Sequence, residues 1–138
     1  MITKEALHKK TSQEITALLY EACLDNLDEA KLAIQNKNYT EANLKLQKAS
    51  DIIHRLGAGI NYEAGIVADQ LDAVYNYIAD IIIEANYKKD LSLVDEAASH
   101  LSGISTAWME AMKHTQDKKP ENIRRQTTAY EQNAIYTD

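Results

Sequence analysis

The sequence contains few residues that cross-link or break a chain. Its 138 residues include one cysteine, one proline and four glycines, and phenylalanine is absent. The single cysteine, Cys23, excludes an internal disulfide, and the scarcity of proline and glycine disfavours a turn-rich β-protein. Eight tyrosines and one tryptophan supply the aromatic surface, and such rings suit half-buried positions. This composition favours long helices in one domain.

Long apolar runs are also missing. No run approaches the roughly 18–20 residues that cross a bilayer, and the beginning of the chain lacks a signal-peptide core. We therefore expect a cytoplasmic protein that does not insert into a membrane. The net charge is −6. Because residues 1–11 carry +2 and residues 115–138 are neutral, residues 12–114 carry −8. An acidic body argues against nucleic acid as a partner.

Apolar residues recur at spacings of three and four in four segments, at about 12–36, 40–57, 61–87 and 91–114, which predicts four amphipathic helices. The connections between them are short, so neighbouring helices are expected to run antiparallel. The sequence therefore predicts an all-α protein, an up-down-up-down four-helix bundle over residues 1–114. Residues 115–138 are predicted to form a polar linker and tail.

The helical stripe of the second segment predicts five inward-facing residues: Ala42, Leu46, Ala49, Ile53 and Leu56. In the third segment the predicted inward stripe includes Val74, Tyr75 and Ile78. Further apolar residues lie beside these stripes, as Leu44, Ile52 and Ile83 do. One stripe per helix cannot bury all of them in a four-helix core. They could pack under loops, pack against a second copy in a homodimer, or line a groove for an amphipathic helix of another chain.

Metal-binding and catalytic patterns are weak in this sequence. Di-metal bundles use Glu-x-x-His on two helices, and this pattern is absent. The nearest approaches are interpreted as solvated ion pairs on helix faces: Asp51 with His54, Glu96 with His100, and Glu110 with His114. Cys23 lies in a helical stripe, where a small thiol usually packs. We therefore expect no enzyme, no metal and no cofactor.

Several motifs together resemble the flagellar export chaperone FliS, and in this order they cover residues 11–113. The motifs are Leu19-Tyr20-x-Ala22-x-Leu24, Asn43-x-x-Leu46-x-Lys48-Ala49-x-x-Ile52-Ile53-x-x-Leu56, Ile60-Asn61, Leu71-x-x-Val74-Tyr75-x-Tyr77-Ile78, Glu84-Ala85-Asn86-x-x-x-Asp90 and Ala107-Trp108-x-x-Ala111. Ala22 stands where the family usually has glycine.

The resemblance implies a non-enzymatic chaperone that binds the C-terminal region of flagellin. In the family this prevents premature polymerisation and delivers flagellin to the flagellar type III export gate. Disordered segments that form helices on docking suit a bundle with spare apolar grooves. The expected client contacts lie on the second and third helices: Asn43, Leu44, Ile52, Ile53, Tyr75, Tyr77 and Ile78. Periodicity does not decide which of these face the core.

The beginning of the chain departs from the family pattern. Family members usually begin with Ala-Tyr-x-x-Asn-x-Val-x-Thr, whereas this chain begins with MITKEALHKK. A similar pattern occurs near the other end, where Tyr130, Asn133 and Ile135 lie in the segment Ala129–Tyr136. In the family the N-terminal segment is thought to occupy part of the client groove. We therefore hypothesise that Ala129–Tyr136 is an intramolecular groove plug. A chance match on a tail, or exchange of tails between two copies, are the alternatives.

The altered beginning also motivates a different function. The chain could be a divergent structural adaptor or a self-associating helical bundle that no longer binds flagellin. The oligomeric state stays open at this point, and a homodimer is one possibility.

Overall fold

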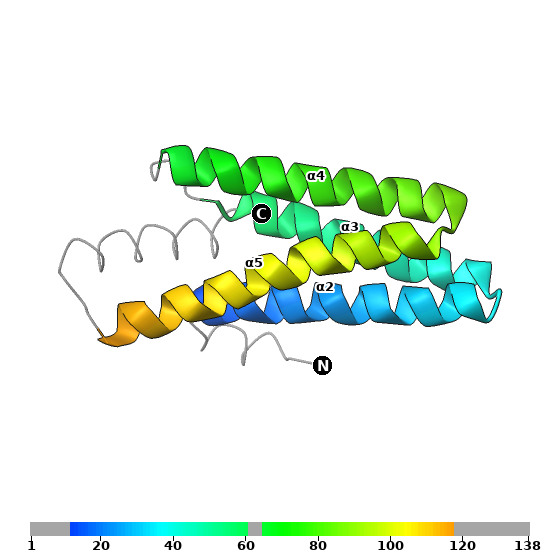
Figure 1. Cartoon of the computed structure of the whole chain (residues 1–138), viewed down its shortest axis with the longest axis horizontal. Helices are drawn as coiled ribbons and strands as arrows, with labels where there is room; N and C mark the ends of the chain where they lie inside the picture. The colour runs from blue at the N-terminus through cyan, green and yellow to red at the C-terminus, as the bar shows by residue number, and fades with distance from the viewer. Residues whose placement is uncertain (1–11, 61–64, 118–138) are drawn as a thin grey trace.

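The computed structural model describes residues 12–60 and 65–117. Within these ranges the chain forms four α-helices and no strand: α2 (Ser12–Gln35), α3 (Tyr39–Ala58), α4 (Ile66–Lys88) and α5 (Leu91–Asp117). Consecutive helices run antiparallel, and the α2–α3 and α4–α5 turns lie at the same end of the bundle (Figure 1). The predicted all-α, up-down-up-down four-helix bundle is confirmed.

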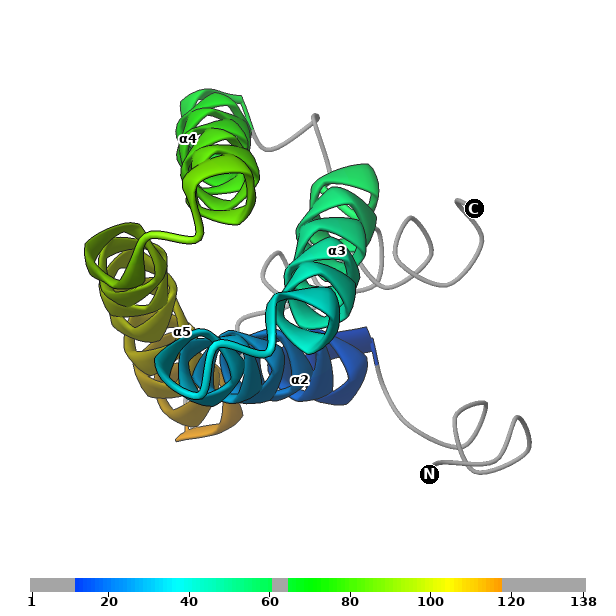
Figure 2. The same ribbon diagram turned by 90° about the vertical axis from the view of Figure 1, so that its right-hand side faces the viewer.

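The four helices form a ring when viewed end-on (Figure 2). α2 and α4 each pack against both α3 and α5. Each of the four interfaces contains a polar link between side chains, with the donor and acceptor atoms 2.7–3.1 Å apart: Lys45 with Glu29, Asn86 with Asn43, Tyr77 with Glu96, and Lys31 with Asp95. These links accompany the packing of the buried stripes, which sets how each helix is rotated against its neighbour.

The two helices that follow the short turns begin with capped ends. The side chain of Asn38 accepts a hydrogen bond from the backbone N–H of Glu41 at 3.3 Å and caps α3. Asp90 Oδ1 accepts bonds from the hydroxyl and the backbone N–H of Ser92, at 2.7 and 2.8 Å, at the start of α5. The bonds from Ser92 lower the pKa of Asp90. Such caps satisfy backbone N–H groups that have no partner inside the helix.

The two helices that precede the short turns end in a left-handed backbone conformation. Lys37 has φ 57° after α2, and Lys89 has φ 51° after α4. Glycine is the usual residue at this position, because a side chain in the left-handed region costs about 1–2 kcal/mol. The backbone N–H of Asn38 donates to Ala33, and that of Asp90 donates to Ala85, which closes the helix ends. The strained residue therefore allows each chain reversal within a few residues.

The core follows the predicted stripes with one exception. All five inward-facing residues predicted for α3 are buried, so this prediction is confirmed. Val74 was expected to face inward and is instead 37% exposed, so that prediction is wrong. Neighbouring helix residues point about 100° apart, and Tyr75, at 2% exposure, occupies the inward position. α5 continues to Asp117, past the expected end near 114.

Packing differs between the two halves of α5. Val94, Ala97 and Leu101 are buried in the half near the turns, whereas no residue in the described part from 102 to 113 is fully buried. Trp108, in the second half, is half-buried and meets the ring of Tyr20 edge-on, with ring centroids 6.2 Å apart. The hydroxyl of Tyr20 is hydrogen-bonded to that of Tyr75. The second half of α5 therefore packs less closely against the bundle than the first half.

Candidate functional site

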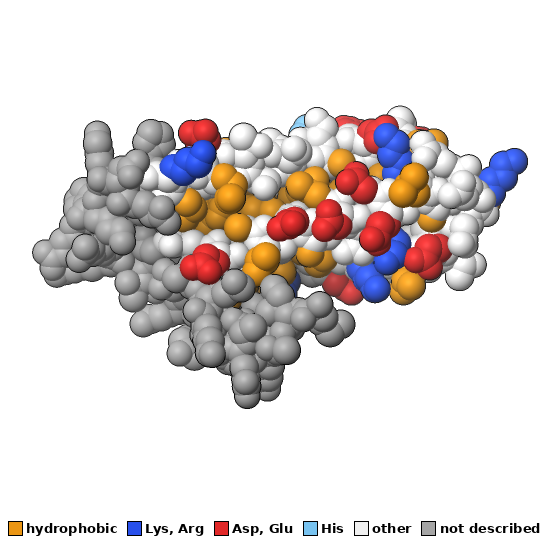
Figure 3. Space-filling model, turned by 90° about the horizontal axis from the view of Figure 1, so that it is seen from below, with side chains coloured by type: hydrophobic (Ala, Val, Ile, Leu, Met, Phe, Trp, Pro, Cys, Tyr) orange, Lys and Arg blue, Asp and Glu red, His pale blue; other side chains and the backbone are white. Residues whose placement is uncertain are grey.

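One hollow of about 360 Å³ lies between the first part of α2 and the last part of α5. In Figure 3, hydrophobic side chains gather in a hollow on the lower face of the bundle, beside a row of acidic side chains. We call this hollow the α2–α5 groove. Its Met109 is 51% exposed. The groove is lined by Glu14, Ala17, Leu18, Glu21, Ser105 and Met109.

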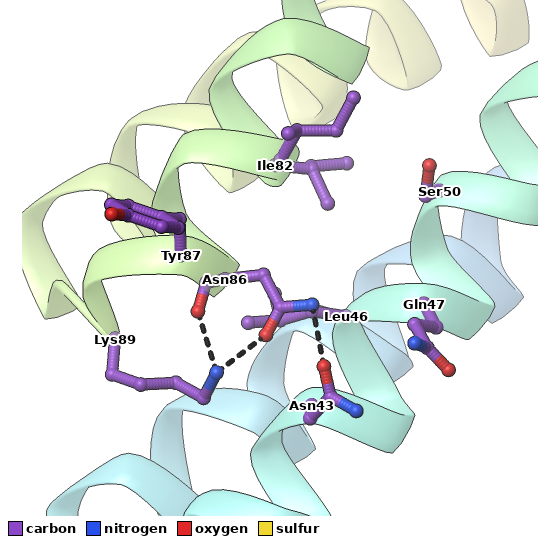
Figure 4. A pocket seen from close by; sticks show the side chains of 9 residues that line it. Asn43, Leu46, Gln47, Ser50, Ile82, Asn86, Tyr87 and Lys89 are labelled. Atoms are coloured by element: carbon purple, nitrogen blue, oxygen red, sulfur yellow. Dashed lines mark hydrogen bonds between the residues drawn. The ribbon is translucent and has the colours of Figure 1, made fainter.

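A second hollow of about 440 Å³ lies between α3 and the last part of α4 (Figure 4). We call it the α3–α4 groove. It has an apolar part and a polar part, and its nine lining residues are Leu46, Ile82, Ile83, Tyr87, Asn43, Gln47, Ser50, Asn86 and Lys89.

The apolar part of the α3–α4 groove follows from helix geometry. Leu46 and Ile82 belong to the core, at 0% and 1% exposure, and form the base of the groove. Ile83 lies next to Ile82 on α4 and is 57% exposed, and Tyr87, one turn further on, is 88% exposed. Residues four apart share a helix face. Ile83 and Tyr87 therefore form an exposed apolar rim above a rigid base.

The polar part is a short hydrogen-bond network. Asn86 Nδ2 donates to Asn43 Oδ1 at 2.9 Å and so joins α4 to α3. Lys89 Nζ donates to the backbone oxygen of Asn86 at 2.5 Å and to its Oδ1 at 2.8 Å (Figure 4). The Asn86 amide thus uses its nitrogen toward α3 and its oxygen toward Lys89. This arrangement holds the lysine ammonium group at one end of the groove.

Three of the seven predicted contact residues lie in the core. Ile53 and Tyr75 are 2% exposed and Ile78 is fully buried. All three belong to the inward stripes of their helices, and Tyr75 bonds to Tyr20 across the bundle. Placed in this way, these side chains stabilise the bundle and offer little surface to a partner.

The other four predicted residues lie on different parts of the surface. Asn43 lines the α3–α4 groove and Ile52 is half-buried. Leu44 and Tyr77 are 44% and 50% exposed. Tyr77 faces α5, where its hydroxyl donates to Glu96 at 3.1 Å, and this bond raises the pKa of Tyr77. The structure thus does not gather the predicted contacts into one site, and their role in binding stays a prediction.

The predicted plug residues lie outside the described residues: Tyr130, Asn133 and Ile135.

The list of expected client contacts omits Ile83, Tyr87 and Lys89, although Ile83 is among the apolar residues that could line a groove. A signal existed for the first two, because Ile83 departs from the inward stripe and Tyr87 follows it by one turn. No signal existed for Lys89, since its place in the groove depends on a left-handed backbone that lysine rarely adopts.

Two features of the described residues concern metal binding and thiol chemistry. These residues contain no cluster of three or more His, Cys, Asp and Glu side chains arranged to hold a metal ion. The Cys23 thiol is buried and lies 3.5 Å from the carbonyl oxygen of Ala49. Burial raises the pKa of Cys23 to about 12, so the thiol stays protonated near neutral pH.

Among the helices in residues 12–60 and 65–117, none combines the length and the apolar character needed to span a bilayer.

Comparison with known proteins identifies the family. A family model described as Flagellar protein FliS matches residues 3–115. The flagellar secretion chaperone FliS of Bacillus subtilis is 28% identical over 110 residues, which is 80% of this chain and 82% of that protein. FliS of Escherichia coli is 27% identical over 111 residues, covering 79% and 82%, respectively. The flagellar secretion chaperone FliSB of Pseudomonas aeruginosa is 32% identical over 92 residues, covering 66% and 73%. The resemblance predicted from the motifs is confirmed, and this four-helix chain belongs to the FliS family.

Proposed function

We propose that this protein is a cytoplasmic export chaperone that binds the disordered C-terminal region of flagellin. In this role it prevents premature polymerisation and delivers flagellin to the flagellar type III export apparatus. The observation that carries the proposal is the α3–α4 groove, with its exposed apolar rim, on a chain of the FliS family. The relatives that match the chain are named flagellar secretion chaperones.

The chemistry of the groove suits an amphipathic helix. Ile83 and Tyr87 expose apolar surface beside an open groove of about 440 Å³. A helix that inserts its apolar face there would cover this surface, and such burial is favourable by roughly 25 cal/mol per Å². A client that is disordered when free loses conformational entropy on docking. Specific binding can therefore be combined with release.

The predicted contact residues that lie outside the α3–α4 groove can also take part in this function. Leu44 and Tyr77 expose apolar surface outside the α3–α4 groove. A long client segment could contact them while its helix occupies the groove. Ile53, Tyr75 and Ile78 contribute by holding α3 and α4 in place. The proposed role requires binding and shielding of the client and no catalysis.

A binding experiment tests the proposal. The purified chain is titrated with the C-terminal segment of flagellin from the same organism by calorimetry. A saturable complex is expected, and Ile83→Glu should weaken it at least tenfold because a carboxylate would enter the apolar interface. Leu32→Glu is the matched control, since Leu32 is 58% exposed on α2 and lies in neither groove. Its affinity should equal that of the unaltered chain.

A different result would contradict the proposed chaperone function. Absence of any complex, together with a dimer in analytical ultracentrifugation that Ile83→Glu dissociates, would favour the alternative of a self-associating adaptor. The exposed apolar residues of α4 motivate this alternative.

A further inference from the structure

Lys89 combines an unfavourable backbone with an ordered side chain. Its φ of 51° and ψ of 44° place it in the left-handed region, where glycine would be unstrained. The side chain turns back over the end of α4 and bonds to Asn86 through two hydrogen bonds. Unlike glycine, Lys89 places an ammonium group beside the groove, where it can have a function.

The charge of the groove indicates what that function is. Among the nine described residues that line the α3–α4 groove, Lys89 is the only charged one. The α2–α5 groove has the opposite character, because Glu14 and Glu21 line it. The whole chain carries a net charge of −6. A single cation in the polar part of this groove, on an acidic protein, offers a carboxylate a distinct place to bind.

We propose that the α3–α4 groove contains a carboxylate-binding subsite at Lys89. An amphipathic helix would place its apolar side chains against Ile83 and Tyr87 and a carboxylate against the Lys89 ammonium group. This inference rests on the proposed function, because the helix is a segment of the flagellin client. The carboxylate comes either from an Asp or Glu side chain or from the end of the client chain.

The hydrogen-bond geometry supports this role. An ammonium group has three donors. Two of the Lys89 donors are directed to Asn86, and the third has no acceptor among the described residues, so that it can serve a ligand. Asn43 holds Asn86 in turn, so the ammonium group is positioned before the client arrives. A preorganised donor loses less side-chain entropy on binding, and a charge-assisted hydrogen bond is stronger than a neutral one.

The test compares two lysines in the same backbone conformation. Lys89→Gln keeps an extended polar side chain and removes the charge, and it should weaken binding of the flagellin C-terminal peptide about tenfold in calorimetry. Lys37→Gln is the control, because Lys37 has φ 57° at the end of α2 and lines neither groove. Its affinity should not change. The loss at Lys89 should shrink in high salt.

A glycine variant separates folding from binding. Lys89→Gly relieves the backbone strain while it removes the side-chain bonds to Asn86. Its melting temperature should therefore equal or exceed that of the unaltered chain, whereas its affinity should fall as much as that of Lys89→Gln. A variant that melts normally but binds poorly would locate the effect in the groove.

Two peptide variants identify the source of the carboxylate. In one, the C-terminus is amidated; in the other, the Asp and Glu side chains are replaced by Asn and Gln. The variant that lacks the relevant carboxylate should bind Lys89→Gln and the unaltered chain equally. If the unaltered chain binds the peptide and Lys89→Gln binds equally well, the subsite is wrong and the proposed function stands. If the unaltered chain does not bind the peptide, the proposed function and the subsite are both overturned.

Discussion

The two grooves of this bundle are similar in size and different in support and charge. The α3–α4 groove has core residues at its base and a cation held by a hydrogen-bond network. The α2–α5 groove has half-buried Leu18, exposed Met109 and carboxylates at its edge, along the part of α5 without fully buried residues. A rigid base favours selective recognition, whereas flexible methionine suits adaptable contacts. Two grooves of the same bundle therefore suit different kinds of contact with a partner.

The difference between the two grooves can be tested first by truncating a residue at the base of each. Leu46→Ala removes a fully buried side chain and should lower the free energy of unfolding by about 3 kcal/mol, through lost burial and a cavity. Leu18→Ala, at a half-buried position of the α2–α5 groove, should cost about 1 kcal/mol. Urea unfolding followed by circular dichroism measures both. Equal losses would mean that Leu18 is packed as closely as Leu46, against the proposed difference between the two grooves.

The rims of the two grooves should differ in client binding. Tyr87→Ala removes the large exposed aromatic side chain of the α3–α4 groove and should weaken flagellin binding by about 2 kcal/mol. Met109→Ala at the α2–α5 groove should weaken it by less than about 1 kcal/mol. Calorimetry with the same flagellin segment compares them. A larger effect at Met109 would assign the main contact to the α2–α5 groove.

Removal of the proposed plug should change flagellin affinity by a smaller amount. If Ala129–Tyr136 occupies a groove when the client is absent, deletion of residues 129–138 removes a competitor. Flagellin affinity should then rise by about three- to tenfold. Double alanine substitution of Tyr130 and Ile135 should reproduce the gain, since these are the proposed anchors. Unchanged affinity in both variants would leave the chance match as the explanation.

The end with the turns should show a modest dependence on pH. Bonds from Ser92 lower the pKa of Asp90 below its ordinary value of 3.8. A carboxylate with a lowered pKa stabilises the fold above the ordinary value, and the contribution disappears as the pH falls through the lower, folded-state pKa. Asp90→Ala should therefore lower the melting temperature at pH 7, and the difference should vanish in acid. A difference that persists at pH 2 would argue against an electrostatic contribution.

The sequence predicted the fold far better than the binding surface. The spacing of Ala42, Leu46 and Ala49 determines which face of α3 points inward, and the core confirms it. Ile53, Tyr75 and Ile78 belong to motifs of the family resemblance, yet such motifs contain core and surface residues alike. The pairing of Asn43 with Asn86 joins residues 43 positions apart. Contacts of this kind, and the left-handed backbone of Lys89, arise only when the helices are assembled.

Trp108 gives the bundle a built-in optical reporter. It is the only tryptophan in the chain and lies half-buried against Tyr20, next to Met109 of the α2–α5 groove. A guest that covers this groove should exclude water from the indole ring and shift its fluorescence to shorter wavelength. A guest confined to the α3–α4 groove should leave the emission spectrum unchanged, so one cuvette and no added label can tell which side of the bundle is occupied.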